Sequence, residues 1–165
     1  MKILVIDNNP EEQANAISAI EDAGHEVVVT DDPLVAIDCV GSADAVITDM
    51  FFNPFIRYDH SESEHYKQNE PPMGLTMVIL AMSLGKPVAV CTDGNHHGQE
   101  LAFVYDGFIH PLVEAAQAEA KKESRPFGTS EIFRFFMTDA PFGWIEGKDW
   151  DLAVRAVVSR LPEQP

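Results

Sequence analysis

The chain has 165 residues, of which 45% are hydrophobic and 23% are charged. This length and balance predict one globular domain with its own core, and they exclude a disordered chain. Eleven Lys and Arg against 27 Asp and Glu give a formal net charge of −16, which argues against nucleic acid or an anionic membrane surface as a partner.

The N-terminus and the cysteines bear on the compartment. Residues 1–7 form a short apolar run that ends at Asp7 without the cleavage region of a signal peptide, so they predict a first strand. No apolar run approaches the ~20 residues of a membrane-spanning helix. Cys39 and Cys91 each lie in an apolar segment, which predicts buried free thiols in a reducing compartment. We therefore expect a cytoplasmic protein.

Strands and helices are predicted to alternate along the chain. Short apolar runs predict buried parallel strands at residues 3–6, 26–30, 45–48 and 87–91. Helical spacing and capping residues predict helices at residues 10–23, 32–41, 75–84, 111–123 and 149–161. A fifth strand is predicted at Phe133–Thr138, with residues 107–109 as the alternative. This alternation is typical of a doubly wound parallel sheet.

Polar residues follow three of these strands. Asp7 and Asp49 end the first and third strand runs, and Thr92 and Asp93 end the fourth. Ligands of doubly wound sheets bind beyond the carboxyl ends of the strands. The sequence therefore predicts a pocket centred on Asp49.

Two segments exceed a minimal five-strand domain. Residues 53–73 form a long polar loop directly after the third strand, and residues 94–131 add a helical segment after the fourth. Loops of such length in compact domains are usually functional or disordered.

The pattern resembles the receiver domain of response regulators in two-component signalling. Residues 2–10 are similar to the first strand and acidic turn of that family, and 46–50 to its phosphoacceptor strand. Residues 74–75, 87–92 and 136–141 are similar to the third-helix glycine, the fourth strand and the fifth strand. The resemblance implies a single domain over residues 1–165, with a five-stranded flavodoxin-like sheet of strand order 2-1-3-4-5.

The resemblance also implies roles for individual residues. Asp49 would be the phosphoacceptor, and Asp7 and Asp49 would hold a weakly bound Mg²⁺. Thr92 would supply the switch hydroxyl, and Phe136 the aromatic side chain that changes rotamer on phosphorylation.

Two positions depart from the family. Asn8 replaces one acidic residue of the first turn, and the lysine after the fifth strand is replaced by Asp139 or, with the alternative strand, by His110. Losing a metal carboxylate and a cation weakens phosphotransfer. We therefore expect an atypical receiver or pseudo-receiver, with no output domain after Leu161, that acts through a protein partner (a histidine kinase or a downstream signalling protein) rather than as an enzyme.

A small metal-dependent hydrolase or phosphatase is the rival hypothesis. Asp7, Asp49 and Asp93 with one histidine would hold the ion, and residues 53–73 would form a lid. The candidate histidines are His60, His65, His96 and His97.

Overall fold

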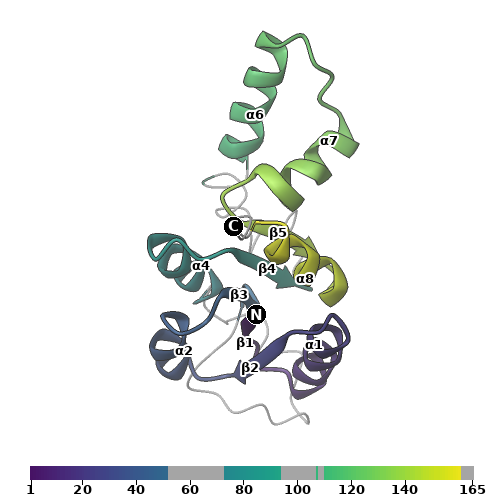
Figure 1. The fold of residues 1–165 in the computed structure, drawn as a ribbon. Helices are drawn as coiled ribbons and strands as arrows, with labels where there is room; N and C mark the ends of the chain where they lie inside the picture. Colours follow the sequence, from purple (N-terminus) through teal and green to yellow (C-terminus); the bar gives the residue numbers. More distant parts are fainter. Residues whose placement is uncertain (52–72, 94–106, 108–109, 161–165) are drawn as a thin grey trace, which may run out of the picture.

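A five-stranded parallel sheet forms the centre of the molecule. The computed structural model describes residues 1–51, 73–93, 107 and 110–160 (Figure 1). Its strands are β1 (Lys2–Ile6), β2 (Glu26–Thr30), β3 (Ala45–Thr48), β4 (Val88–Thr92) and β5 (Gly143–Glu146). They run parallel in the order β2-β1-β3-β4-β5, which confirms the predicted flavodoxin-like sheet and its strand order.

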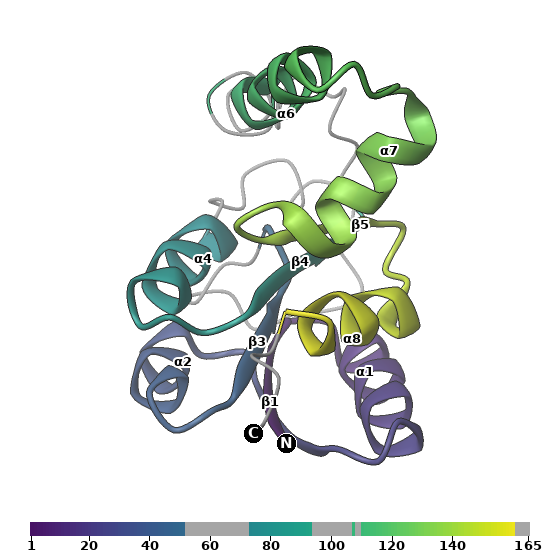
Figure 2. The same cartoon turned by 45° about the horizontal axis from the view of Figure 1, so that its top comes forward.

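Helices cover both faces of this sheet. Helices α1 (Pro10–Asp22) and α8 (Trp150–Val158) lie on one face, and α2 (Pro33–Val40) and α4 (Met73–Ser83) lie on the other (Figure 1). Each of these four helices was predicted within a few residues of its observed bounds. Helices α6 (His110–Lys122) and α7 (Thr129–Arg134) extend away from the sheet on the side of β5 (Figures 1 and 2).

Each sheet face has its own apolar core, because successive strand residues point to opposite faces. Ile3, Val5 and Ile47 pack with α1 and α8, whereas Leu4 and Ile6 pack with α2 and α4. All five side chains are fully buried. Burial on both faces is what continuous apolar runs predict for central parallel strands.

The predicted fifth strand at Phe133–Thr138 is wrong. These residues belong to α7 and to the π-helical turn η4 (Phe135–Asp139), and the strand that pairs with β4 is β5. A short apolar run does not distinguish a buried strand from a helical segment by periodicity alone. In the alternative strand, residues 108 and 109 lie outside the described ranges.

One local hydrogen bond and a group of long-range ones stabilise this helical segment. The Glu131 carboxylate accepts a hydrogen bond from the backbone N–H of Gly128 at 2.9 Å, which is one half of a capping box at the start of α7. Arg160, two residues after α8, donates to the carbonyl oxygens of Met137 (2.7 Å), Phe136 and Ala140. These bonds fix the carbonyl groups of η4 against α8.

The second insertion contains helix α6. The helix predicted at 111–123 is confirmed as α6, whereas residues 53–72 and 94–106 lie outside the described ranges. Within the portion described, no helix has the length and apolar character that crossing a membrane requires.

Candidate functional site

Two buried carboxylates lie at the carboxyl end of the sheet. Asp7 directly follows β1, Asp49 directly follows β3, and the two strands are neighbours in register. Asp7 is fully buried, and Asp49 is 6% exposed. The predicted convergence of these two residues is confirmed by the ion pairs that they share with one lysine.

That lysine is Lys148, and its side chain is 9% exposed. Its ammonium group bonds Oδ2 of Asp7 and lies 2.9 Å from Oδ2 of Asp49. The expectation that Asp139 or His110 replaces the lysine is therefore wrong, because it placed the fifth strand too early. The site contains a buried cation between the two carboxylates, contributed from beyond β5.

The turn between β5 and α8 brings Lys148 to this position. Glu146 is level with Thr92 in the sheet, and the Gly147 N–H donates to the Thr92 carbonyl at 2.9 Å. Gly147 and Lys148 both have positive φ, of 72° and 54°. A left-handed conformation is unfavourable for a lysine, and strained backbone of this kind is frequent at functional sites. Asp149 then caps α8 by accepting from the Leu152 N–H.

Backbone groups hold the other two carboxylate oxygens. Oδ1 of Asp7 accepts from the Asn9 N–H at 2.8 Å, and Oδ1 of Asp49 accepts from the Met50 N–H at 2.7 Å. Gln13 donates to the Asp7 carbonyl at 2.6 Å. Because a carboxylate oxygen has two lone pairs, each oxygen retains acceptor capacity beyond its present partner.

One lysine compensates only one of the two carboxylates. Burial raises the pKa of Asp49 from an ordinary 3.8 to about 6, with Lys148 opposing the rise and Asp7 adding to it. Burial likewise raises the pKa of Asp7, and Lys148 opposes it. Burial lowers the pKa of Lys148, but the charges of Asp49 and Asp7 more than offset this, so its pKa is raised. The site therefore combines a permanent cation with excess negative charge.

Trp150 and Glu12 support the ammonium group from the side of α1. The Lys148 ammonium lies 5.7 Å from the centroid of the Trp150 ring, within the range of a cation–π interaction. The Trp150 indole donates from Nε1 to the Glu12 carboxylate at 2.8 Å. Trp150 is 5% exposed, so its ring is fixed by packing as well as by this bond.

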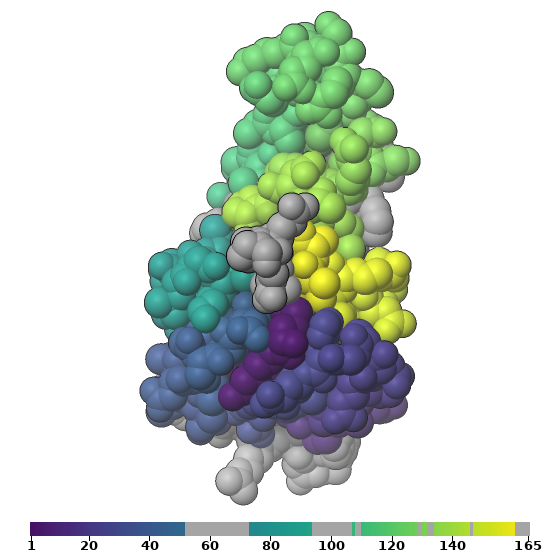
Figure 3. Space-filling model, viewed as in Figure 1, coloured from purple at the N-terminus to yellow at the C-terminus, as the bar shows by residue number. Residues whose placement is uncertain are grey.

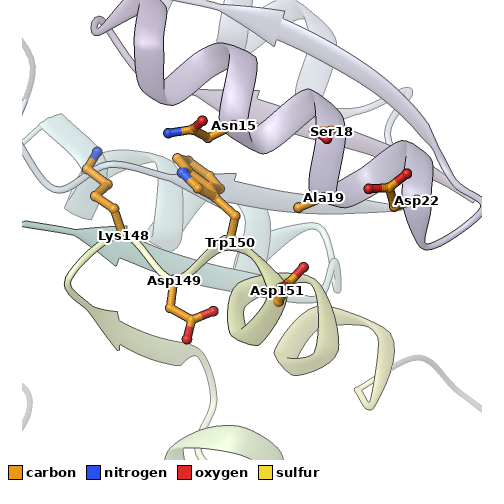
Figure 4. Close-up of a pocket in the computed structure, with 8 residues that line it drawn as sticks. All are labelled: Asn15, Ser18, Ala19, Asp22, Lys148, Asp149, Trp150 and Asp151. Carbon is orange, nitrogen blue, oxygen red and sulfur yellow. The ribbon is translucent and has the colours of Figure 1, made fainter.

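A pocket of about 420 Å³ lies beside this arrangement, between α1 and the start of α8. Figure 4 shows the Trp150 ring directed toward α1, near Asn15, with Asp149 pointing away from that helix. The pocket is lined by Asn15, Ser18, Ala19, Asp22, Lys148, Asp149, Trp150 and Asp151. Lys148 thus borders both the carboxylates and the pocket.

The end of β4 contributes two further predicted residues. Thr92 is fully buried, and the neighbouring Asp93 is exposed. The Asp93 charge raises the pKa of Asp49, which indicates that Asp93 lies on the same edge of the sheet. Cys91 is buried, and burial raises the pKa of its thiol, so this cysteine is unsuited to act as a nucleophile.

Phe136 does not lie on the fifth strand. It is a buried residue of η4, where its ring contacts that of Phe135 at a centroid distance of 5.2 Å. The aromatic residue of β5 is Trp144, which is level with Val90 of β4. The error about Phe136 follows directly from the misplaced strand.

The acidic donor set fits a magnesium ion. Asp7 and Asp49 offer oxygen ligands only, and Mg²⁺ is commonly bound through one or two carboxylates together with water and phosphate oxygens. Lys148 would compete with such an ion for both Oδ2 atoms. Along the ranges described, no group of three or more His, Cys, Asp or Glu side chains is placed to hold a metal. The histidines of the hydrolase hypothesis, His60, His65, His96 and His97, lie outside those ranges.

No protein-family model and no curated protein matches the chain. Among solved structures, the chain is similar to the CMP N-glycosidase BcmB of Clostridium botulinum, with 12% sequence identity and a TM-score of 0.39. The similarity covers 64% of this chain and 81% of that one.

Proposed function

We propose that the chain is a receiver-like signalling protein in which Asp49 accepts a phosphoryl group. The observation that carries this proposal is the position of Lys148, which bonds the carboxylates of Asp7 and Asp49. Carboxylate phosphorylation uses a carboxylate nucleophile, and an acidic neighbour and a cation that act on the phosphoryl oxygens. Lys148 adds the one group that the sequence had not revealed.

The proposed step is an in-line displacement. A carboxylate oxygen of Asp49 attacks the phosphorus atom of a small phosphodonor such as acetyl phosphate. A bond forms between that oxygen and phosphorus, the bond from phosphorus to the acetate oxygen breaks, and acetate leaves with the electron pair. Lys148 stabilises the negative charge of the phosphoryl oxygens. A magnesium ion held by Asp7 and Asp49 would neutralise charge on the same oxygens.

Further roles follow from the same proposal. Thr92, at the end of β4, would hydrogen-bond the phosphoryl group. Trp144, rather than Phe136, would be the strand aromatic that couples the site to the surface near β5. Asn8 leaves the first turn with one carboxylate fewer, so we propose slow phosphorylation. The signal would pass to a protein partner, either a histidine kinase or a downstream signalling protein.

Intact-mass analysis after incubation with acetyl phosphate and Mg²⁺ tests the proposal. We expect one phosphoryl group on the wild type and none on Asp49→Asn. Asp38→Asn is the matched control, because it removes an exposed carboxylate on α2 and leaves the site intact. Lys148→Met should show a much lower rate of labelling, since it removes the cation without adding a polar group.

Two results would contradict phosphorylation at Asp49. One is the absence of any adduct on the folded wild type at saturating acetyl phosphate and Mg²⁺. The other is an equal adduct on wild type and Asp49→Asn, which would place the phosphoryl group elsewhere. The first result would favour a pseudo-receiver that acts by binding its partner without modification.

A further inference from the structure

Lys148 lies in a turn, where the strands of the sheet do not fix its side chain. Strand β5 ends at Glu146, and the backbone of Lys148 is left-handed, with φ of 54°. A lysine side chain is long and flexible, so holding it in one conformation has a large entropic cost. Contacts of the side chain itself must therefore place the ammonium group between Asp7 and Asp49.

The Trp150 ring supplies one contact that the two carboxylates do not. The Lys148 ammonium group lies 5.7 Å from the centroid of this ring, and the face of an indole attracts a cation. Trp150 is the first residue of α8, and it packs in the same buried cluster as Ala16 and Ile20 of α1. In Figure 4 the side chains of Lys148 and Trp150 both extend from the turn toward α1. The ring therefore gives the ammonium group a rigid surface on one side.

Glu12 on α1 holds this ring from its opposite edge. The Trp150 indole donates from Nε1 to Oε2 of Glu12 at 2.8 Å, and Asn15 donates from Nδ2 to the same oxygen at 3.5 Å. Helices α1 and α8 contact each other and lie side by side in the space-filling view (Figure 3). A series of contacts thus runs from α1 through Glu12 and Trp150 to Lys148.

We propose that Trp150 and Glu12 are positioning residues, which hold the Lys148 ammonium group between the carboxylates of Asp7 and Asp49. They act through Lys148 and not on the phosphoryl group. A carboxylate that accepts the indole N–H also polarises the ring, which strengthens its attraction for a cation. The effect on phosphorylation rests on the proposed function of Asp49, whereas the effect on the position of the lysine does not.

The pKa of Asp49 reports the position of the lysine without any phosphodonor. Lys148 opposes the rise in this pKa, whereas Asp7 and Asp93 add to it. We expect Trp150→Leu to raise the pKa of Asp49 above its value of about 6, because an ammonium group that is no longer held pairs less well with the carboxylate. A pH titration of the Asp49 carboxyl carbon by NMR measures the change.

Val157→Ala is the control for general loss of stability. Val157 is a fully buried residue of α8 in the same apolar cluster as Trp150. It lies seven residues further along the helix, a distance of about 10 Å at the rise of an α-helix. The truncation removes core packing without reaching Lys148, so it should leave the pKa of Asp49 unchanged.

The rate of labelling by acetyl phosphate is the second measurement. Trp150→Leu should lower it by about tenfold, because a charged group that acts on the transition state loses its fixed position. Trp150→Phe should lower it less, since the phenyl ring keeps a face for the cation. In a Lys148→Met background, Trp150→Leu should have little further effect, because the group through which Trp150 acts is absent.

Two substitutions of Glu12 separate its hydrogen bond from its charge. Glu12→Ala and Glu12→Gln both remove the charge, which raises the pKa of Asp7 in the wild type, but glutamine keeps an acceptor for the indole N–H. Glu12→Ala should therefore label at least about threefold more slowly than Glu12→Gln, the effect of one hydrogen bond. Glu11→Ala is the matched control, because Glu11 is an exposed acid in the same first turn of α1 and should label like the wild type.

Circular dichroism confirms that each variant is folded before it is compared. A Trp150→Leu variant with the wild-type pKa of Asp49 would overturn the proposal, and so would a Val157→Ala variant that shifts this pKa as much. Equal rates for Glu12→Ala and Glu12→Gln would contradict the role of the Glu12 bond. A folded wild type that is not labelled at all would contradict the proposed function instead, and the pKa of Asp49 would then decide the positioning role alone.

Discussion

Lys148 is the residue on which the electrostatics of the site depend. Its ammonium group bonds two carboxylates that are themselves almost fully buried. Transfer of an unpaired charge from water to a protein interior is costly, and a buried charge that loses its partner is strongly destabilising. The folded state therefore requires a cation at this position.

Replacement of this lysine tests that requirement. We expect Lys148→Met to lower the free energy of unfolding at pH 7 by about 3–5 kcal/mol, because two buried carboxylates lose their counter-charge. Part of the loss should be recovered at pH 5, where the carboxyl groups take up protons. Urea denaturation at both pH values measures the effect.

The surface lysine Lys122 provides the comparison. Its side chain is 72% exposed and pairs with Glu119, and exposed pairs contribute little to stability. Lys122→Met should therefore differ little from the wild type at either pH. Equal effects of the two substitutions would show that Lys148 has no special electrostatic role.

At the scale of elements, the start of α4 packs directly on the Asp49 backbone. Gly74 donates from its N–H to the Met50 carbonyl at 3.0 Å. A Cβ atom on Gly74 would lie 1.9 Å from the Asp49 carbonyl oxygen. The Thr48 hydroxyl donates to that same oxygen at 2.8 Å. The approach of α4 to β3 thus fixes the peptide group of Asp49.

Substitution of Gly74 should disturb both elements. Gly74→Ala forces either α4 or the Asp49 peptide to move, and we expect a loss of about 1–3 kcal/mol in the free energy of unfolding, as for other overpacked sites. The displacement should also shift the backbone amide resonances of Asp49 and Met50 in NMR spectra. Chemical denaturation and a ¹H–¹⁵N spectrum measure the two effects.

Gly41 is the matched glycine. It ends α2 with φ of −61°, and an added Cβ would meet nothing within 4 Å. Gly41→Ala should remain within about 1 kcal/mol of the wild type, on the stabilising side, because alanine reduces the freedom of the unfolded chain. A Gly74→Ala variant as stable as Gly41→Ala would contradict the close packing.

The elements also show which parts of the fold the sequence could reveal. Strands β1, β3 and β4 are predictable because each is a continuous apolar run that ends at a polar residue. Strand β5 is harder, since Gly143–Glu146 has four residues and contains one glycine and one acid. The longer, aromatic-rich segment at 133–138 was chosen as the fifth strand instead. The spacing of Gly128 and Glu131, which form half of a capping box, is a signal for the start of a helix there.

Each residue of the site could be predicted only where the strand that it follows could be predicted. Asp7 and Asp49 could be placed together because parallel strands end at the same edge. Lys148 could not be identified without the position of β5. Its side chain reaches the two carboxylates through a turn in which Gly147 and Lys148 both have a left-handed backbone conformation. Positive φ is expected for Gly147, but nothing in the sequence indicates it for a lysine.

For the whole molecule, stability should depend on pH through Asp49. Its pKa in the folded state is about 6, above the ordinary 3.8, so the folded protein holds this proton more tightly than the unfolded chain does. The stability contributed by that proton is full below about pH 4 and is lost as pH rises through 6. Above pH 7 the loss amounts to about 3 kcal/mol, because each pKa unit corresponds to about 1.4 kcal/mol.

Asp49→Asn removes this titration. The stability of the variant relative to the wild type should increase from pH 4 to pH 6 and level off above 7. The attraction of Lys148 needs no separate correction, because it is already part of what sets the pKa of Asp49. Thermal or urea denaturation across the range measures the difference, with Asp38→Asn as the exposed control. A difference that is flat with pH would show that Asp49 titrates normally.

The bond between Lys148 and Asp7 joins residues separated by 141 positions in the sequence. During synthesis on a ribosome, β1 and β3 emerge long before the turn that contributes the lysine. Until then the nascent chain has two carboxylates with no cation to accompany them into the interior, so burial of this end of the sheet is unfavourable. We therefore expect docking of β5 and α8 to complete the core and the acidic site together, late in folding.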